Sequence, residues 1–290
     1  MATLQDIKRK IGAVKKTQQI TKAMNMVSAA KLRGAQQRME GFRPYAKAFS
    51  MMLGNMAGRV EPEIHPFFQQ AASVQRVGLV LMTADRGLCG SFNVNLINTA
   101  EKFLKAKAQE QVEVNLVTVG KKGSDYFRRR KAQVRKAYTD LFNAFDMTTA
   151  AGIGQDSIEN FLLGNADEVY LLYGQFINMG IQRPVLQKLL PIAPPAGAEG
   201  PAGGGPDYLF EPSPEAIFNE LLPRYVNVQI YRGLLENAAS EQAARMTAMD
   251  NATRNCKELV NSLTLIYNKA RQSAITKELM DIVGGAEALK

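Results

Sequence analysis

The polar and apolar positions of the sequence follow a helical pattern near the C-terminus. Apolar or small residues recur there at alternating steps of three and four, which is the spacing of a coiled-coil seam. The members of this row are Met249, Ala252, Cys256, Leu259, Leu263, Ile266, Ala270 and Ser273. Ser213 and Pro214 suit the start of the helix, the first as a capping hydroxyl and the second as a first-turn proline. The pattern therefore predicts a C-terminal coiled-coil helix over residues 213–286.

The N-terminal stretch shows the same spacing and predicts a second coiled-coil helix over residues 1–57. Its row is apolar at both ends and polar in the middle, and it comprises Leu4, Ile7, Ile11, Val14, Gln18, Thr21, Asn25, Ser28, Leu32, Ala35, Met39 and Phe42. Across the polar part, Ile20, Met24 and Val27 lie on a neighbouring stripe. One interpretation is a stutter that rotates the seam locally. The other, compatible with the first, is that this stripe faces outward towards a second surface.

Between the two helices the pattern changes to short apolar runs that alternate with helical segments. Such alternation predicts a compact α/β unit with a mostly parallel sheet over residues 75–192. The predicted strands are Val77–Leu81, Val112–Val119, Gln133–Ala137, Val169–Tyr173 and Ile181–Leu190, the last being an edge strand because it contains Pro184. The predicted helices are 91–107, a segment from Gly120 into the basic cluster at 128–131, and 157–163.

A stretch rich in proline and glycine, residues 191–206, follows the α/β unit and predicts a loop without a fold of its own. The expected architecture is a Rossmann-like α/β domain inserted between N- and C-terminal long helices. Because those helices lie at opposite ends of one chain and both carry a heptad stripe, they most simply pair as a long antiparallel coiled coil.

The net charge of +9 is concentrated in the N-terminal helix. Residues 1–50 hold eleven lysines and arginines against two carboxylates, Asp6 and Glu40. This asymmetry predicts an acidic partner, which could be nucleic acid, anionic lipid or a carboxylate-rich protein surface. The basic side chains ring the helix rather than leaving one broad apolar face, which favours a coiled coil in an acidic socket over a membrane-surface helix. No run of eighteen apolar residues is present, so a soluble or peripheral protein is expected.

The candidate chemical motifs favour structural roles. The turn at 83–93 joins a strand to a helix and is rich in glycine, but it lacks the motifs of a P-loop or a dinucleotide site. Neither Asp85 nor Cys89 has a recognisable acid or base partner, and His65, the single histidine, has no partner set for metal binding. The basic cluster at 128–131 suits a helix C-terminus. We therefore expect no catalytic residue, cofactor or metal, and two buried free thiols at Cys89 and Cys256.

Three segments together are similar to one known family. The N-terminal ITKAMNMVSAAKL, the turn DRGLCGSFNVN, and the C-terminal SEQAARMTAMDNAT with ITKELMDIVGGAEAL resemble the gamma subunits of F-type ATP synthases. The resemblance covers essentially the full length in the expected order. It implies a non-catalytic rotor shaft whose rotation couples proton flow to ATP synthesis. The implied partners are the hexamer of alpha and beta subunits, the epsilon subunit and the ring of c subunits, with neither nucleic acid nor a small-molecule substrate.

The resemblance also implies contact positions and a cellular place. The partner-contact residues fall on Met24, beside Lys8, Arg9 and Arg33 of the basic helix, and on four residues of the C-terminal helix, Arg245, Gln272, Thr276 and Glu278. The implied location is peripheral, on the cytoplasmic face of a bacterial plasma membrane. A cysteine pair like that of the thiol-regulated chloroplast members is not recognisable, which predicts redox insensitivity. Two other functional classes stay open from the residues alone: a nucleic-acid- or membrane-binding coiled-coil adaptor, and an enzyme in the α/β unit.

Overall fold

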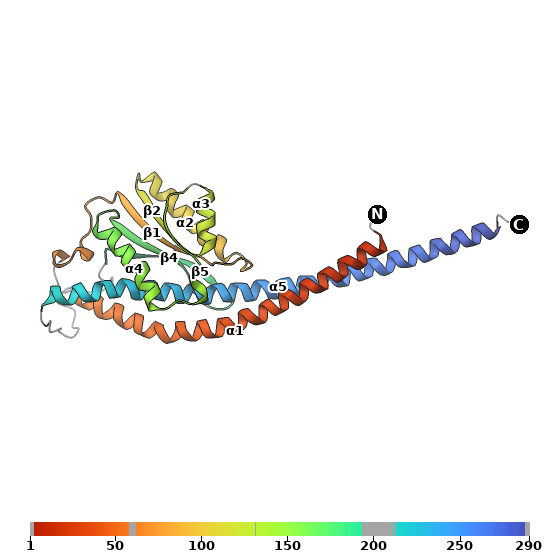
Figure 1. Ribbon diagram of the computed structural model, residues 1–290, viewed down its shortest axis with the longest axis horizontal. Coiled ribbons are helices and arrows are strands. Elements are labelled where there is room, and N and C mark those ends of the chain that lie inside the picture. The colour runs from red at the N-terminus through yellow and green to blue at the C-terminus, as the bar shows by residue number, and fades with distance from the viewer. Residues whose placement is uncertain (1–2, 58–61, 131, 193–210, 212, 288–290) are drawn as a thin grey trace. The chain divides into compact units, whose positions relative to one another are not determined.

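The computed structural model describes residues 3–57, 62–130, 132–192, 211 and 213–287. The chain divides into two compact units, one formed by Met1–Ala29 with Arg245–Lys290 and the other by Ala30–Ala244. We call these the coiled-coil unit and the α/β unit. The long helices α1 (Leu4–Ala57) and α5 (Pro214–Glu287) contribute to both, and α1 begins and α5 ends in the coiled-coil unit (Figure 1).

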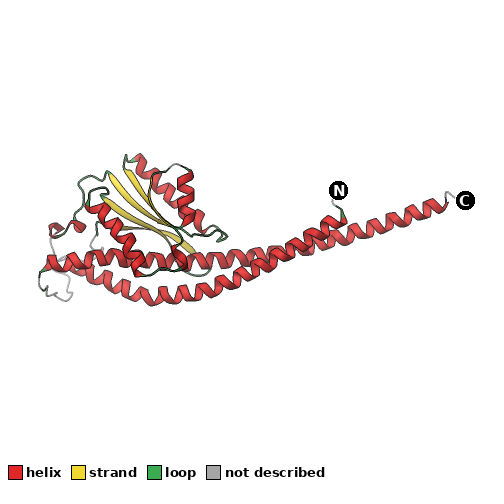
Figure 2. Cartoon of the chain, in the orientation of Figure 1, coloured by secondary structure: helices red, strands yellow, loops and turns green. Residues whose placement is uncertain are grey.

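The α/β unit is built on a five-stranded sheet with the order β3-β2-β1-β4-β5. Figure 2 shows its strands in yellow. The strands are β1 (Arg76–Met82), β2 (Glu113–Val119), β3 (Val134–Tyr138), β4 (Glu168–Phe176) and β5 (Gln182–Leu190). β1 lies parallel to β2 and β4, and β2 lies parallel to β3. β5 runs antiparallel to β4 at the edge of the sheet. A proline is tolerated in an edge strand, because the strand pairs on one side only and the missing N–H can face away from its neighbour. The predicted sheet, mostly parallel with Pro184 in an edge strand, is therefore confirmed.

Helices cover both faces of the sheet, because successive side chains of each buried strand point to opposite sides. On one face α2 (Phe92–Gln109) and α3 (Lys121–Arg129) enclose a core that includes Leu79, Leu81 and Leu116. The other face is covered by α4 (Met147–Leu162) and by the part of α5 in this unit (Figure 1). Gly233 permits that close approach, because a Cβ there would lie 3.0 Å from Leu171 Cδ2.

Two segments differ from the predicted secondary structure. α4 begins at Met147, ten residues before the predicted start, because Asp146 forms a capping box with Thr149 and accepts its N–H at 2.9 Å. The residues that follow are mainly threonine, alanine and glycine, so the apolar periodicity of this part of the helix is weak. The helix nevertheless buries Ala150 and Ile153. Between α1 and β1, where the sequence pattern predicts neither a helix nor a strand, lie two one-turn 3-10 helices, Pro62–Ile64 and Pro66–Phe68. From residue 193 onward, the predicted loop at 191–206 lies outside the described residues.

An ion pair between a partly exposed arginine and a buried carboxylate joins both long helices to the sheet within the α/β unit. Arg43 of α1 donates from Nε and Nη2 to the two carboxylate oxygens of Glu236 of α5, at 2.9 and 3.0 Å. Arg43 also donates to the carbonyl of Phe176, and the Phe176 N–H donates to Glu236, so the end of β4 joins the network. Glu236 is fully buried, and its hydrogen bond raises the pKa of Arg43 above the ordinary value. This bidentate pair fixes the register of α1 against α5.

Candidate partner-contact surface

The coiled-coil unit pairs the start of α1 with the end of α5 in antiparallel fashion. Thr21 Oγ1 lies 2.8 Å from Thr253 Oγ1, and Asn25 Nδ2 donates to the carbonyl of Met246 at 2.9 Å. Moving towards the C-terminus along α1 therefore means moving towards the N-terminus along α5. The predicted antiparallel coiled coil is confirmed, and side-chain hydrogen bonds contribute to its seam.

The seam of α1 passes through its polar positions without rotating. Thr21 and Ser28 are only 8% and 2% exposed, whereas Ile20 and Val27 on the neighbouring stripe are 60% and 57% exposed. The stutter interpretation was therefore wrong, and the outward-facing interpretation describes the chain. A buried hydroxyl is tolerated when it is hydrogen-bonded, and Thr21 Oγ1 also reaches the carbonyl of Gln18 at 3.1 Å.

The seam of α5 is shifted from the predicted row at alternate positions. Val260 and Tyr267 are partly buried, whereas their predicted counterparts Leu259 and Ile266 are half exposed. Both choices fit steps of three and four, because adjacent residues can each satisfy a 3.5-residue period. The predicted row was chosen for the large apolar residues Leu259 and Ile266, but these lie on the outer side of the helix pair.

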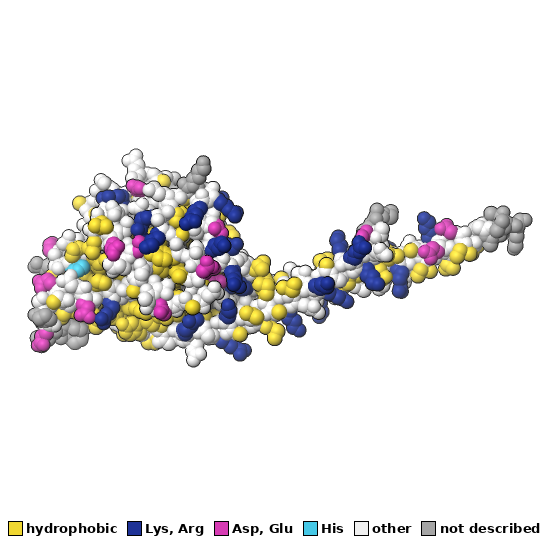
Figure 3. Space-filling view, viewed as in Figure 1, with side chains coloured by type: hydrophobic (Ala, Val, Ile, Leu, Met, Phe, Trp, Pro, Cys, Tyr) yellow, Lys and Arg dark blue, Asp and Glu magenta, His cyan; other side chains and the backbone are white. Residues whose placement is uncertain are grey.

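Apolar side chains are exposed along both helices of this unit (Figure 3). A monomeric protein rarely exposes a large contiguous apolar surface, and such patches mark interaction sites. The exposed large apolar residues are Ile20, Met26 and Val27 of α1, and Leu259, Leu265, Ile266, Ile275, Leu279, Met280, Ile282 and Val283 of α5. We call this set the partner-contact surface.

Exposed cations lie along the same part of α1 (Figure 3). Within the part of the chain that the structure describes, no ion pair neutralises the basic side chains of its first turns, Lys8, Arg9, Lys10, Lys15, Lys16 and Lys22. Arg9 and Lys10 also line a cleft of about 500 Å³ between α1 and α5. The combination of apolar area with unneutralised positive charge fits a partner that is both apolar and acidic.

The residues predicted to contact partners differ in exposure. Lys8, Arg9 and Arg33 are exposed on α1, and Met24 is half-buried beside the seam. Three of the predicted residues of α5 are exposed, Gln272, Thr276 and Glu278. Arg245 is only 7% exposed, so its own chain already covers most of the side chain. The roles of all eight residues stay predictions.

The glycine-rich turn after β1 is held by hydrogen bonds within the chain. Asp85 accepts the backbone N–H groups of Lys121, Asp140 and Phe142 at 3.0, 2.9 and 3.3 Å. Gly120 has φ +99°, and a Cβ there would lie 2.2 Å from the carbonyl oxygen of Thr83. These contacts give Asp85 and the glycine backbone a positioning role, in line with the structural interpretation of the turn.

The other polar candidates also lie in local contacts. Arg130 lies over the ring of Tyr126, with its guanidinium carbon 3.9 Å from the ring centroid, and within 3.7 Å of Glu101. His65 is buried and its Nδ1 accepts the N–H of Phe67 at 3.1 Å. Neither cysteine forms a disulfide, as expected, but only Cys89 is fully buried, whereas Cys256 lies partly exposed in the seam. Position 131 of the basic cluster lies outside the described residues.

The described residues offer neither a metal site nor a membrane-spanning helix. No cluster of three or more histidine, cysteine, aspartate or glutamate side chains there could hold a metal ion. Likewise, none of the described helices is long and apolar enough to span a membrane.

Comparison with known proteins decides the family. The sequence profile of the family described as ATP synthase matches residues 3–289. The ATP synthase gamma chain of Syntrophobacter fumaroxidans is 58% identical over 291 residues, covering 100% of both chains. The chain belongs to the ATP synthase gamma chain family. The resemblance noted in the sequence is thereby confirmed.

Solved structures show the same fold. A chain of the Tetrahymena thermophila mitochondrial ATP synthase, from a structure of its central stalk and c-ring, is 25% identical with a TM-score of 0.64. The match covers 80% of this chain and 99% of that one. A chain of the rotor of the Euglena gracilis mitochondrial ATP synthase is 20% identical with a TM-score of 0.67, over 94% and 98% of the two chains. The fold of a gamma subunit, a mixed sheet with long terminal helices, is therefore shared by proteins of low sequence identity.

Sequence reasoning left the polar seam open between two interpretations and missed the Arg43–Glu236 pair. The seam had a signal, because the row at Thr21, Asn25 and Ser28 kept its spacing while losing its apolar character. The ion pair had none, since its partners are 193 residues apart in the sequence.

Proposed function

We propose that this chain is the turning shaft of an ATP synthase and carries out no chemical step itself. The supporting observation is the coiled-coil unit, whose paired helices expose apolar and basic side chains along their outer sides. Two helices wound together resist bending and twisting better than one, which a torque-transmitting element requires. Membership in the gamma chain family supplies the biological setting.

In this proposal, the hexamer of alpha and beta subunits surrounds the coiled-coil unit. A carboxylate-rich loop of beta faces Lys8, Arg9 and Arg33, with Met24 at the contact. The epsilon subunit and the ring of c subunits bind the α/β unit, and proton flow turns the ring together with this chain. Rotation of an asymmetric shaft then brings each catalytic site through different affinities in turn. The assembly lies on the cytoplasmic face of a bacterial plasma membrane.

Purification from membranes tests the assignment of partners. A tagged chain is expected to co-purify with ATPase-active alpha and beta subunits and with the epsilon and c subunits. Recovery of nucleic acid in their place, with binding that weakens steeply as salt is added, would instead support the adaptor class.

The variant Met24→Lys tests the contact itself. An added ammonium is expected to pair with the acidic loop and to hold the shaft at preferred angles, so that fewer protons are pumped for each ATP hydrolysed. The measurement is proton pumping and ATP hydrolysis in membrane vesicles that contain the assembled complex. Asn98→Lys, an exposed position on α2, is the matched control and leaves the coupling ratio unchanged. An unchanged ratio of protons pumped to ATP hydrolysed in the Met24→Lys complex would contradict a contact between Met24 and the acidic loop.

A further inference from the structure

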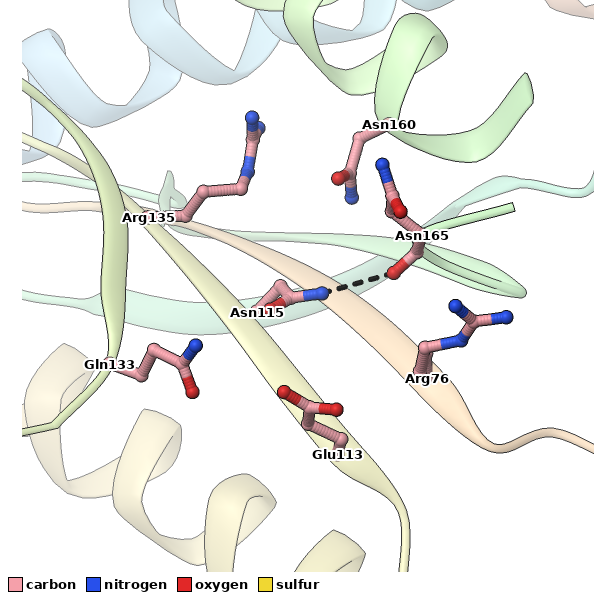
Figure 4. A pocket seen from close by; sticks show the side chains of 7 residues that line it. All are labelled: Arg76, Glu113, Asn115, Gln133, Arg135, Asn160 and Asn165. Carbon is pink, nitrogen blue, oxygen red and sulfur yellow. Dashed lines mark hydrogen bonds between the residues drawn. The ribbon is translucent and has the colours of Figure 1, made fainter. Parts of the chain in front are cut away.

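A polar pocket lies at the amino-terminal ends of three parallel strands in the α/β unit. It has a volume of about 340 Å³ and is bounded by β1, β2, β3 and the end of α4 (Figure 4). Small-molecule sites typically have volumes of roughly 300–1,000 Å³. The lining residues are Arg76, Glu113, Asn115, Gln133, Arg135, Asn160 and Asn165, none of which belongs to the partner-contact surface.

Asn160 is a largely buried residue among the described residues that line this pocket. It is only 7% exposed, and its amide points from α4 towards the centre of the pocket (Figure 4). No hydrogen bond joins this amide to another residue in the described part of the chain. The amide is open to the pocket, since its atoms are not among the described side-chain atoms that are shut off from solvent without a hydrogen-bond partner, so it can bind a partner that enters from outside. Asn115, by contrast, donates from Nδ2 to the carbonyl of Asn165 at 3.0 Å. This hydrogen bond joins β2 to the segment between α4 and β4 on the side of the pocket.

Two opposite charges stand side by side at the strand ends without pairing. Arg76 of β1 and Glu113 of β2 are register partners, so their side chains leave the same face of the sheet. No ion pair joins either residue to a charge among the described residues. Arg135 differs, because Asp156 binds both of its terminal nitrogens and also Lys136. The pocket therefore offers one guanidinium and one carboxylate that are free to bind a ligand.

We infer that this pocket binds a small zwitterion of the size of an amino acid or a dipeptide. Its carboxylate pairs with Arg76, its ammonium with Glu113, and an amide of the ligand with Asn160. Glu113 disfavours an inorganic anion, since it places a like charge at the strand ends. A nucleotide is disfavoured because none of the described residues that line the pocket has an aromatic side chain to stack on a base. The site binds a ligand and catalyses no reaction. The inference is independent of the proposed rotor function.

Calorimetric titration of the full chain with glycylglycine and with L-glutamine tests the inference. Millimolar or tighter binding is expected for at least one of them. Two blocked dipeptides separate the charges: N-acetylglycylglycine lacks the ammonium, and glycylglycinamide lacks the carboxylate. Each is expected to bind about tenfold more weakly or worse, because one charge-assisted hydrogen bond is lost.

Three variants locate the site. Arg76→Gln and Glu113→Gln, both exposed at the rim, are expected to weaken binding of the zwitterion by about tenfold or more while leaving the unfolding temperature unchanged. Arg128→Gln, an exposed arginine of α3 outside the pocket, is the matched control and leaves binding intact. Absence of binding at about 10 mM of both zwitterions would overturn the inference. Equal affinity for the blocked dipeptides, or equal loss in the control variant, would overturn it as well.

Discussion

At the scale of single residues, Arg43 and Glu236 form a bidentate ion pair in the α/β unit. The carboxylate of Glu236 is fully buried, whereas the Arg43 side chain keeps 40% of its exposure. The two partners are therefore not equivalent. Removing the arginine leaves a buried charge without its counter-ion, whereas replacing the carboxylate leaves a cation that can turn towards water.

Arg43→Met is expected to lower the free energy of unfolding by about 3–5 kcal/mol. Glu236→Gln is expected to cost about 1–2 kcal/mol, because its amide oxygen can still accept the N–H of Phe176. Chemical denaturation of the purified chain measures both. Arg224→Met breaks the exposed pair with Glu220 and serves as the control, with a loss below about 0.5 kcal/mol. Equal losses for the two Arg→Met variants would contradict the buried-pair argument.

His65 makes the stability of the chain depend on pH near neutrality. Burial lowers the pKa of His65 below its ordinary value of 6.5, although a hydrogen bond with Asn219 opposes the shift. The unfolded chain therefore takes up a proton at higher pH than the folded chain. The contribution of His65 is complete above pH 6.5 and is lost as the pH falls below that value, with a slope of at most about 1.4 kcal/mol per pH unit.

The unfolding temperature between pH 7 and pH 5 checks this expectation. His65→Asn keeps an acceptor for the N–H of Phe67 but cannot titrate, so its profile is expected to be flatter than that of the native chain over the same range. Because the chain contains a single histidine, no other imidazole contributes. Parallel profiles for the native chain and the variant would show that His65 is not the source of the slope.

At the scale of elements, the coiled-coil unit keeps one continuous seam through polar positions. Thr21 and Asn25 bond across to Thr253 and the carbonyl of Met246. Their burial frees Ile20 and Val27 for the outer side of α1, where they contribute nothing to pairing within the chain. The apolar side chains of this stretch thus lie where partners can reach them.

The double variant Ile20→Gln with Val27→Gln is expected to unfold within about 0.5 kcal/mol of the native chain, because both positions are exposed. Ser28→Leu is expected to destabilise it by about 1–3 kcal/mol, since a larger side chain must enter a fully packed position. Thermal unfolding followed by circular dichroism distinguishes the two. A large loss of stability in the glutamine variant, with none in the leucine variant, would support the stutter interpretation instead.

At the scale of the whole molecule, residues from the two ends of the sequence form one unit and the middle of the chain forms the other. The basic excess belongs to the N-terminal helix, so the charge of the protein is placed on a particular element rather than spread over the surface. The two cysteines are divided between the units, Cys89 in the α/β unit and Cys256 in the coiled-coil unit.

The ATP hydrolysis rate of the assembled complex is expected not to change when dithiothreitol is added. Neither cysteine forms a disulfide, and neither lies in an inserted pair that could close a regulatory one. The measurement compares the rate before and after reduction, with a serine variant of each cysteine as the control. A rate that rises or falls on reduction of the native complex, but not of the serine variants, would contradict this expectation.

The sequence by itself determined the long terminal helices, the alternation of strands and helices, the edge position of the strand with Pro184 and the excess charge on one element. These features follow from local periodicity, turn chemistry and composition, which a single chain segment carries within itself. The tertiary structure alone decided which stripe of each long helix is buried, how Arg43 meets Glu236, and which polar residues gather around Asn160. Those outcomes depend on groups from segments far away in the sequence. A local pattern does not specify how deeply such a segment buries a side chain or which residue it contacts.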